Sequence, residues 1–173
     1  YPPLDRLLKA LPDFIEKKVI RTFSGSFHII HGDLCFSNIL MEDGFGFIRV
    51  IDPRGQFGGY DIYGDGRYEL AKLLHTLEGN YDFIIEDMFS LEAEGTSIRY
   101  QAPQKSLRAL EVFRDVFAEE LQDEAAVRLI EATLFLSMIP LHADAGARQL
   151  AMLATGLELL RQVPGAQEVL SCA

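Results

Sequence analysis

The sequence has little cysteine and little positive charge, and each shortage argues against a class of protein. Cys35 and Cys172 are the two cysteines among 173 residues, and they form no Cys-X-X-Cys or Cys/His pattern. A disulfide framework and a zinc module are therefore disfavoured, and a reducing cytoplasm is the expected location. The net charge of −10 argues against a nucleic-acid partner, because phosphate-backbone binding needs clustered Lys and Arg.

Long apolar runs and a leader sequence are also missing. We find no stretch close to the ~20 apolar residues of a membrane span, so we expect no membrane partner. The start, Tyr1-Pro2-Pro3, has neither the positive charge nor the apolar run of a signal peptide. It also lacks an initiating Met. These features indicate a cytoplasmic chain that is a piece of something longer.

The pattern of apolar residues predicts one α+β domain over residues 1–173, mainly α-helical. Leucines recur at helical spacing from Leu4 to Leu11, and we expect Pro12 to end that helix and a second to run to about residue 21. Gly55–Gly66, rich in glycine, is predicted to be a loop. Further helices are predicted at about 65–78, from Pro103, at 123–138 and at 145–163, and a β-hairpin at 89–93 and 98–100.

The densest polar cluster, His31 to Asn38, lies between short apolar segments. Strands are predicted at 27–30, 38–41 and 45–51, with a turn at 42–44 that makes the last two a hairpin. Asp33 then lies after a strand, Asn38 at the start of the next, and Asp52 at the end of its hairpin partner. Carboxylate and amide oxygens suit Mg²⁺ held together with phosphates, and another acid can take a proton from a hydroxyl.

The segment HGDLCFSN, followed by IDPRG, resembles the catalytic loop and metal-binding segment of the aminoglycoside phosphotransferase and choline kinase family. That family is similar to protein kinases. The resemblance covers about Phe27 to Leu77. It implies a protein-kinase-like C-terminal lobe with a small β-hairpin insert at the catalytic loop.

The resemblance also implies roles for individual residues. Asp33 corresponds to the catalytic base, and Asn38 and Asp52 correspond to the Mg²⁺ ligands. His31 corresponds to a structural support of the loop. Asp65 resembles the acid that braces the loop from below, although a helix N-cap is the stronger reading of its position.

The implied activity is transfer of the γ-phosphate of ATP or GTP to a hydroxyl of a sugar, amino alcohol or aminoglycoside-like molecule. The expected cofactor is Mg²⁺ and the expected partners are a nucleotide and a small acceptor. No glycine-rich phosphate loop precedes His31, so we expect the nucleotide-clamping N-terminal lobe to lie outside this chain. Two alternatives stay open: a non-catalytic kinase-like module of a larger protein, and a Mg²⁺-dependent phosphohydrolase.

Two arginines near the cluster are secondary candidates. Arg54 and Arg67 can contact phosphate or an anionic substrate, but arginines at such positions are more often surface or ion-pair residues.

Overall fold

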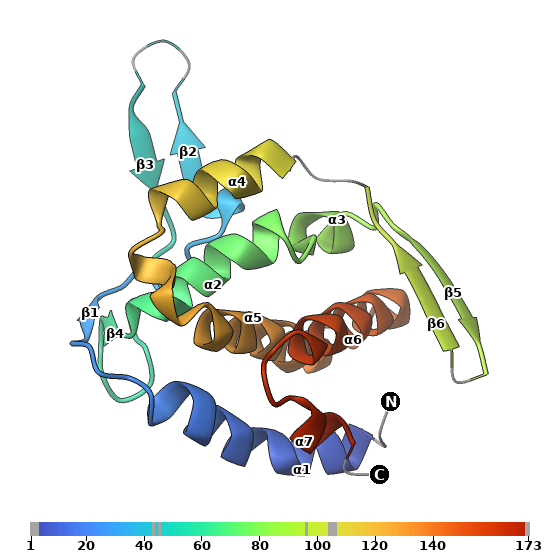
Figure 1. Ribbon diagram of the computed structural model, residues 1–173. Helices are drawn as coiled ribbons and strands as arrows, with labels where there is room; N and C mark the ends of the chain where they lie inside the picture. Colours follow the sequence, from blue (N-terminus) through green and yellow to red (C-terminus); the bar gives the residue numbers. More distant parts are fainter. Residues whose placement is uncertain (1–3, 43, 45, 96, 104–106, 172–173) are drawn as a thin grey trace.

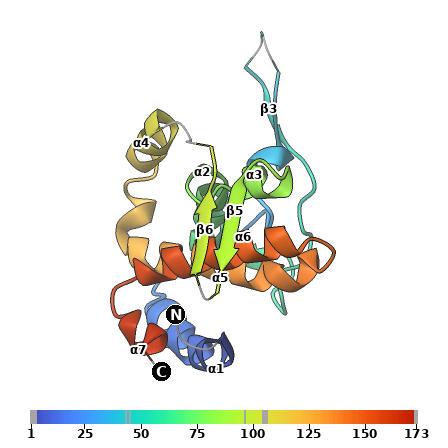
Figure 2. The ribbon, with the colours of Figure 1, turned by 90° about the vertical axis from the view of Figure 1, so that its right-hand side faces the viewer.

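The computed structural model describes residues 4–42, 44, 46–95, 97–103 and 107–171. The protein is a mixed α+β structure, mainly helical, which confirms the predicted class. Figure 1 shows a helical body from which two β-hairpins project, β2–β3 on one side and β5–β6 on another. Figure 2, turned by 90°, shows that the β2–β3 hairpin stands clear of the helices.

Three helices form the centre of the body. They are α2 (Gly66–Leu77), α5 (Glu124–Met138) and α6 (Gly146–Arg161), and α5 packs against both of the others. The predictions for these three segments are confirmed to within a few residues. Asp123 caps α5 by accepting a hydrogen bond from the Ala126 N–H, which satisfies one of the free N–H groups of the first turn.

We expected no segment with the length and composition of a membrane span, and one segment does have them. Among the described residues, the helical stretch Glu120–His142 is long and apolar enough to cross a bilayer. In the fold this stretch contains α5, whose Val127, Leu129 and Phe135 are fully buried against neighbouring elements. A helix that is apolar on most sides and packed by others is typical of the core of a soluble protein.

The N-terminal helix runs through its proline, contrary to the prediction. Helix α1 spans Leu4–Ile15 with Pro12 inside it, and a π-helical segment, Glu16–Ile20, follows directly. Proline removes one intrahelical hydrogen bond, and here the carbonyl that loses its donor belongs to Leu8. Leu8 lies on the exposed side of the helix, where water can replace the donor. The helix therefore continues, and its other face buries Leu7 and Leu11.

The strands form three separate two-stranded sheets. The predicted hairpins are confirmed as β2 (Ile39–Met41) with β3 (Ile48–Val50), and β5 (Ser90–Glu94) with β6 (Ser97–Gln101). The predicted turn at 42–44 includes Asp43, and the strand predicted from 45 begins at Phe45. Asp43 and Phe45 lie outside the described residues.

One pairing corrects the sequence analysis. The strand β1 (His28–Ile29) pairs with β4 (Tyr63–Gly64), which lies in the segment 55–66 that we predicted to be entirely loop. The pairing continues as a hydrogen bond from the Ile30 N–H to the Ile62 carbonyl. It brings the start of α2 next to the segment that leads into His31.

Smaller elements complete the fold. A helix was predicted from Pro103, and in the described residues it spans Leu107–Val116. Residues 104–106 lie outside the described residues. Two short helices were not predicted, α3 and α7. The remaining bounds are α3 Tyr81–Ile85, α4 Leu107–Val116, α7 Gln167–Leu170, and the 3₁₀ segments Phe36–Asn38, Glu120–Asp123 and Ile139–His142.

Candidate active site

The loop after β1 is fastened to helix α2 by one carboxylate. Glu69 lies in the first turn of α2, and its two oxygens accept hydrogen bonds from the backbone N–H groups of His31 (2.9 Å) and Gly32 (3.0 Å). Hydrogen bonds to a charged acceptor are the stronger kind. The loop that carries Asp33 therefore has a fixed position relative to a core helix.

Gly32 explains why the loop needs glycine at this point. Its φ is +75°, and an added Cβ would lie 2.9 Å from the Cβ of Arg54. Any L side chain would meet both a strained backbone and a close neighbour. The adjacent backbone contact, from the Arg54 N–H to the His31 carbonyl at 2.8 Å, holds the two segments together.

Asp33 is held by two side chains. The Lys72 ammonium lies 2.6 Å from Oδ1, and the Asn38 amide donates to the Asp33 carbonyl at 2.9 Å and to Oδ2 at 3.3 Å. Partial burial acts to raise the pKa of Asp33. The hydrogen bond and charge of Lys72, the charge of Arg54 and the hydrogen bond of Asn38 outweigh it, so the pKa lies below the ordinary 3.8. The carboxylate is ionised at neutral pH.

His31 links the loop to the end of β3. Its Nε2 lies 2.9 Å from the Ile51 carbonyl, and its Nδ1 accepts a hydrogen bond from the Asp33 N–H at 3.3 Å. Because Nδ1 acts as the acceptor, Nε2 is the nitrogen that can donate to the Ile51 carbonyl. The ring therefore ties the Asp33 loop to the residue that precedes Asp52.

Asp52 follows β3 on the strand that pairs with Asn38. The Ile51 N–H donates to the Asn38 carbonyl at 3.0 Å, which places the two backbones side by side. Asp52 has a left-handed backbone, with φ of 59°, and Asp adopts this conformation more readily than most residues. Its side chain is exposed and makes no hydrogen bond or ion pair with another described residue.

The two expected Mg²⁺ ligands fit a metal in part. The Asn38 amide nitrogen faces Asp33, so its oxygen points elsewhere, and the Asp52 carboxylate is not engaged by a described neighbour. Both are hard oxygen donors. Among the described residues, no three His, Cys, Asp or Glu side chains gather as a metal site. A site here would therefore consist of one amide and one carboxylate, completed by phosphate oxygens and water.

Asp65 is placed differently from the sequence expectation. It caps α2 by accepting a hydrogen bond from the Arg67 N–H at 2.9 Å, which confirms the N-cap reading, and its carboxylate pairs with the Arg67 guanidinium at 2.7 Å. The contact with the Asp33 loop is made by Glu69, one turn further on. The physical reason is that the Asp65 carboxylate is already occupied at the helix start.

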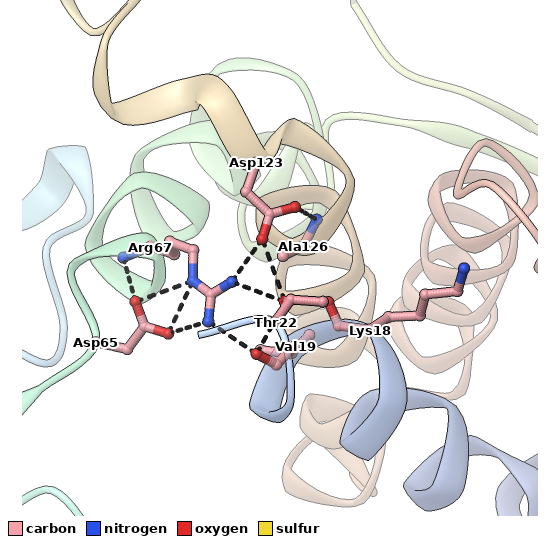
Figure 3. A network of polar contacts seen from close by, with 7 residues as sticks. All are labelled: Lys18, Val19, Thr22, Asp65, Arg67, Asp123 and Ala126. Atoms are coloured by element: carbon pink, nitrogen blue, oxygen red, sulfur yellow. Dashed lines mark hydrogen bonds and ion pairs between the residues drawn. The ribbon is translucent and has the colours of Figure 1, made fainter. Parts of the chain in front are cut away.

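Figure 3 shows the network around Arg67. The guanidinium also pairs with Asp123 at 2.7 Å and donates to the Val19 carbonyl at 2.9 Å. The Asp65 and Asp123 partners raise the pKa of Arg67 against the opposing effect of its burial. This network, consisting of Asp65, Arg67, Asp123 and the Val19 carbonyl, fastens the start of α2 to the end of the N-terminal helical segment and to the start of α5. The interpretation of Arg67 as an ion-pair residue is therefore confirmed.

A cavity of about 480 Å³ opens beside Asp33. Its charged and phenolic lining residues are Asp33, Arg54, Tyr68, Lys72 and Tyr81. The other lining residues, which come from the N-terminal segment, α5 and the turn after it, are mostly apolar. The volume is in the range of pockets that bind metabolite-sized ligands.

Glu69 and Lys72 are the site residues that the sequence reasoning missed. The sequence did hold a signal for Lys72, which lies between apolar residues in the segment Leu70–Leu74. A lysine is almost never buried unless it is paired, so a lysine in such a segment suggests a buried ion pair. Glu69 and Lys72 are three residues apart and so share a face of the helix. The sequence did not indicate that this face meets the loop.

No protein-family model matches the chain, and neither the curated proteins nor the solved structures include a significant match.

Proposed function

We propose that the chain is the catalytic lobe of a small-molecule kinase that transfers the γ-phosphate of ATP or GTP to a hydroxyl group. The observation that carries the proposal is the placement of Asp33. Its ionised carboxylate is fixed by Lys72 and Asn38 at the edge of a cavity that has room for a small acceptor. The kinase-like order of His31, Asp33, Asn38 and Asp52 supports the same reaction class.

The proposed chemistry assigns one role to each group. Asp33 accepts a hydrogen bond from the acceptor hydroxyl and orients its oxygen toward the terminal phosphorus. The new O–P bond forms as the bond between that phosphorus and the bridging oxygen breaks, the nucleoside diphosphate leaves, and the hydroxyl proton passes to Asp33. Asn38 and Asp52 would hold Mg²⁺, which neutralises charge on the phosphates when bound.

A carboxylate of low pKa is suited to this role. In phosphoryl transfer the transition state is loose, so positioning and electrostatics contribute more than early proton removal. The Lys72 ammonium keeps Asp33 ionised and fixes the direction of its second oxygen. A strongly basic group is not required.

The test is the variant Asp33→Asn in the full-length protein, which keeps the shape of the side chain and removes its charge. We expect kcat for Mg²⁺- and ATP-dependent phosphorylation of the best acceptor in a hydroxyl-compound panel to fall by about 10²–10⁴-fold. The matched control is Asp115→Asn on the exposed face of α4. Both variants are checked by circular dichroism. Unchanged turnover in a folded Asp33→Asn protein refutes the assignment.

The same assay separates the alternatives. Phosphate release without any acceptor, lost in Asp33→Asn, would assign a phosphohydrolase. A protein that binds ATP and Mg²⁺ by calorimetry but transfers nothing would be a binding module.

A further inference from the structure

The cavity beside Asp33 has a charge opposite in sign to that of the whole protein. Its lining residues include two cations, Arg54 and Lys72, and one carboxylate, Asp33, in a chain whose net charge is −10. Apart from Asp33, no Asp or Glu among the described residues lines it. A concave site of one sign attracts a ligand of the other.

Lys72 brings a cation to the inner end of the cavity. Its side chain is only 8% exposed, and its ammonium has three N–H donors, of which one points at Asp33. Burial of an ammonium is unfavourable unless anions or acceptors surround it. The remaining donors therefore favour a second oxyanion in the cavity.

Arg54 supplies a second cation at the mouth. Its backbone N–H is hydrogen-bonded to the loop. Its guanidinium donates to the Tyr68 hydroxyl over a long 3.4 Å and has no carboxylate partner within 4 Å among the described residues. Arginine presents a planar pair of donors that matches phosphate and carboxylate. Because Tyr68 accepts from Arg54, its own O–H is available to donate to the same ligand.

The rest of the lining is mostly apolar and includes Val19, Ile130, Leu134 and Met138. Its two hydroxyl side chains, Thr133 and Ser137, donate hydrogen bonds to backbone carbonyls of their own helix. A ligand that fills the cavity therefore has a polar end with an oxyanion and a less polar body.

We infer that the acceptor bound in this cavity is a hydroxyl compound that carries its own phosphate or carboxylate, held by Arg54 and Lys72 while Asp33 orients the hydroxyl. This inference deepens the proposed function and rests on it. The terminal phosphate of the nucleotide is the other source of an oxyanion near Asp33. We assign the cations to the acceptor because Asn38 and Asp52, the residues given to the nucleotide side, do not line the cavity.

The experiment compares acceptors that share a scaffold and differ in charge. The panel holds glycerol, glycerol 3-phosphate and glycerate, the matching ribose, ribose 5-phosphate and ribonate, and the cationic glucosamine and kanamycin. Transfer from γ-labelled ATP is measured with the full-length protein, for the wild type, for Arg54→Gln, and for Arg99→Gln. Arg99 is the control because its guanidinium is 75% exposed on β6 and pairs with Glu92.

We expect the anionic members to have the highest kcat/KM. Arg54→Gln should lower their kcat/KM by at least about 10-fold through KM, since a charge-assisted contact is lost, and should change the values for neutral acceptors and the KM for ATP much less. Arg99→Gln should match the wild type. The phosphate and carboxylate arms show which oxyanion is preferred.

Three results overturn the inference while the kinase proposal stands: neutral or cationic acceptors are best, Arg54→Gln affects all acceptors alike, or the KM for ATP rises instead. If no acceptor is phosphorylated, binding is measured by NMR with the same panel. If the anionic members of the panel bind and this binding is lost in Arg54→Gln, the anion-binding role of the cavity is supported and the kinase proposal is refuted. Absence of such binding refutes both.

Discussion

The sharpest structural test concerns Glu69, whose carboxylate holds the Asp33 loop by two backbone hydrogen bonds, 2.9 Å to His31 and 3.0 Å to Gly32. The variant Glu69→Gln keeps the size of the side chain. A carboxamide has one acceptor oxygen, so one of the two N–H groups must face an NH₂ group. The variant therefore loses one charge-assisted hydrogen bond and places two donors against each other.

The magnitude follows from the burial of the contact. A hydrogen bond to a charged group contributes about 1.5–3 kcal/mol, and Glu69 is half-buried, so the lower part of that range applies. We expect the free energy of local opening of the loop to fall by about 1.5–2 kcal/mol. Amide exchange at Gly32 and His31 should then accelerate by about 10- to 30-fold, since 1.4 kcal/mol corresponds to a factor of ten.

The assay is native-state hydrogen exchange followed by NMR. Glu111→Gln, an exposed substitution of the same kind on α4, is the control and should leave both amides unchanged. Glu69→Asp keeps the negative charge in the first turn of α2 but shortens the side chain. This variant therefore distinguishes the hydrogen bonds to His31 and Gly32 from the general stabilisation by an acid near a helix N-terminus. Exchange at Gly32 that is as slow in Glu69→Gln as in the wild type would refute the bracing role.

Two further predictions concern other charged contacts of α2. Arg67→Met leaves Asp65 and Asp123 without their shared cation, so the free energy of unfolding in urea should fall by about 2–4 kcal/mol. The control Arg99→Met, at an exposed ion pair, should change this free energy by less than ~0.5 kcal/mol. Equal effects of the two variants would contradict the network. Lys72→Met removes the contact that keeps the pKa of Asp33 low, so the pKa measured by NMR titration should rise; an unchanged value would contradict the pairing. In the wild type this lowered pKa stabilises the fold above pH 3.8, and the contribution is lost as the pH falls through the native pKa; the Lys72→Met variant should lose less stability on the acid side.

Local patterns were sufficient to predict the elements that have local causes. Helix α5 begins at its capping Asp123 and ends at Met138, as its composition indicates, and the β2–β3 pairing follows from two short apolar runs. The rule that proline ends a helix failed at Pro12, because the position of Leu8 at the surface depends on which face of α1 packs. Strand β4 was missed because a two-residue strand exists only through its partner β1, which is distant in sequence.

The candidate site divides in the same way. The offset between Asp33 and Asn38 is a local feature, and the structure brings the two side chains into contact. Which acid of α2 meets the loop depends on how the helix is rotated about its axis, and the sequence favoured Asp65 on resemblance alone. The rotation is set by buried Leu70, Leu73 and Leu74, which pack against α5 and α4, and it directs Glu69 to the loop.

Under the proposed function, the buried Lys72 serves the site more than the stability of the fold. A buried ion pair is weak evidence for stability, because apolar residues of similar volume often do as well or better. The fold already has a large apolar core where α5 packs between α2 and α6, and it does not need a charge at position 72. The ammonium fixes the orientation of the Asp33 carboxylate and lowers its pKa. It does so from a helix whose start is fastened by Arg67 and whose first turn holds the loop. Such support by a rigid element is what a reacting group needs to keep its geometry.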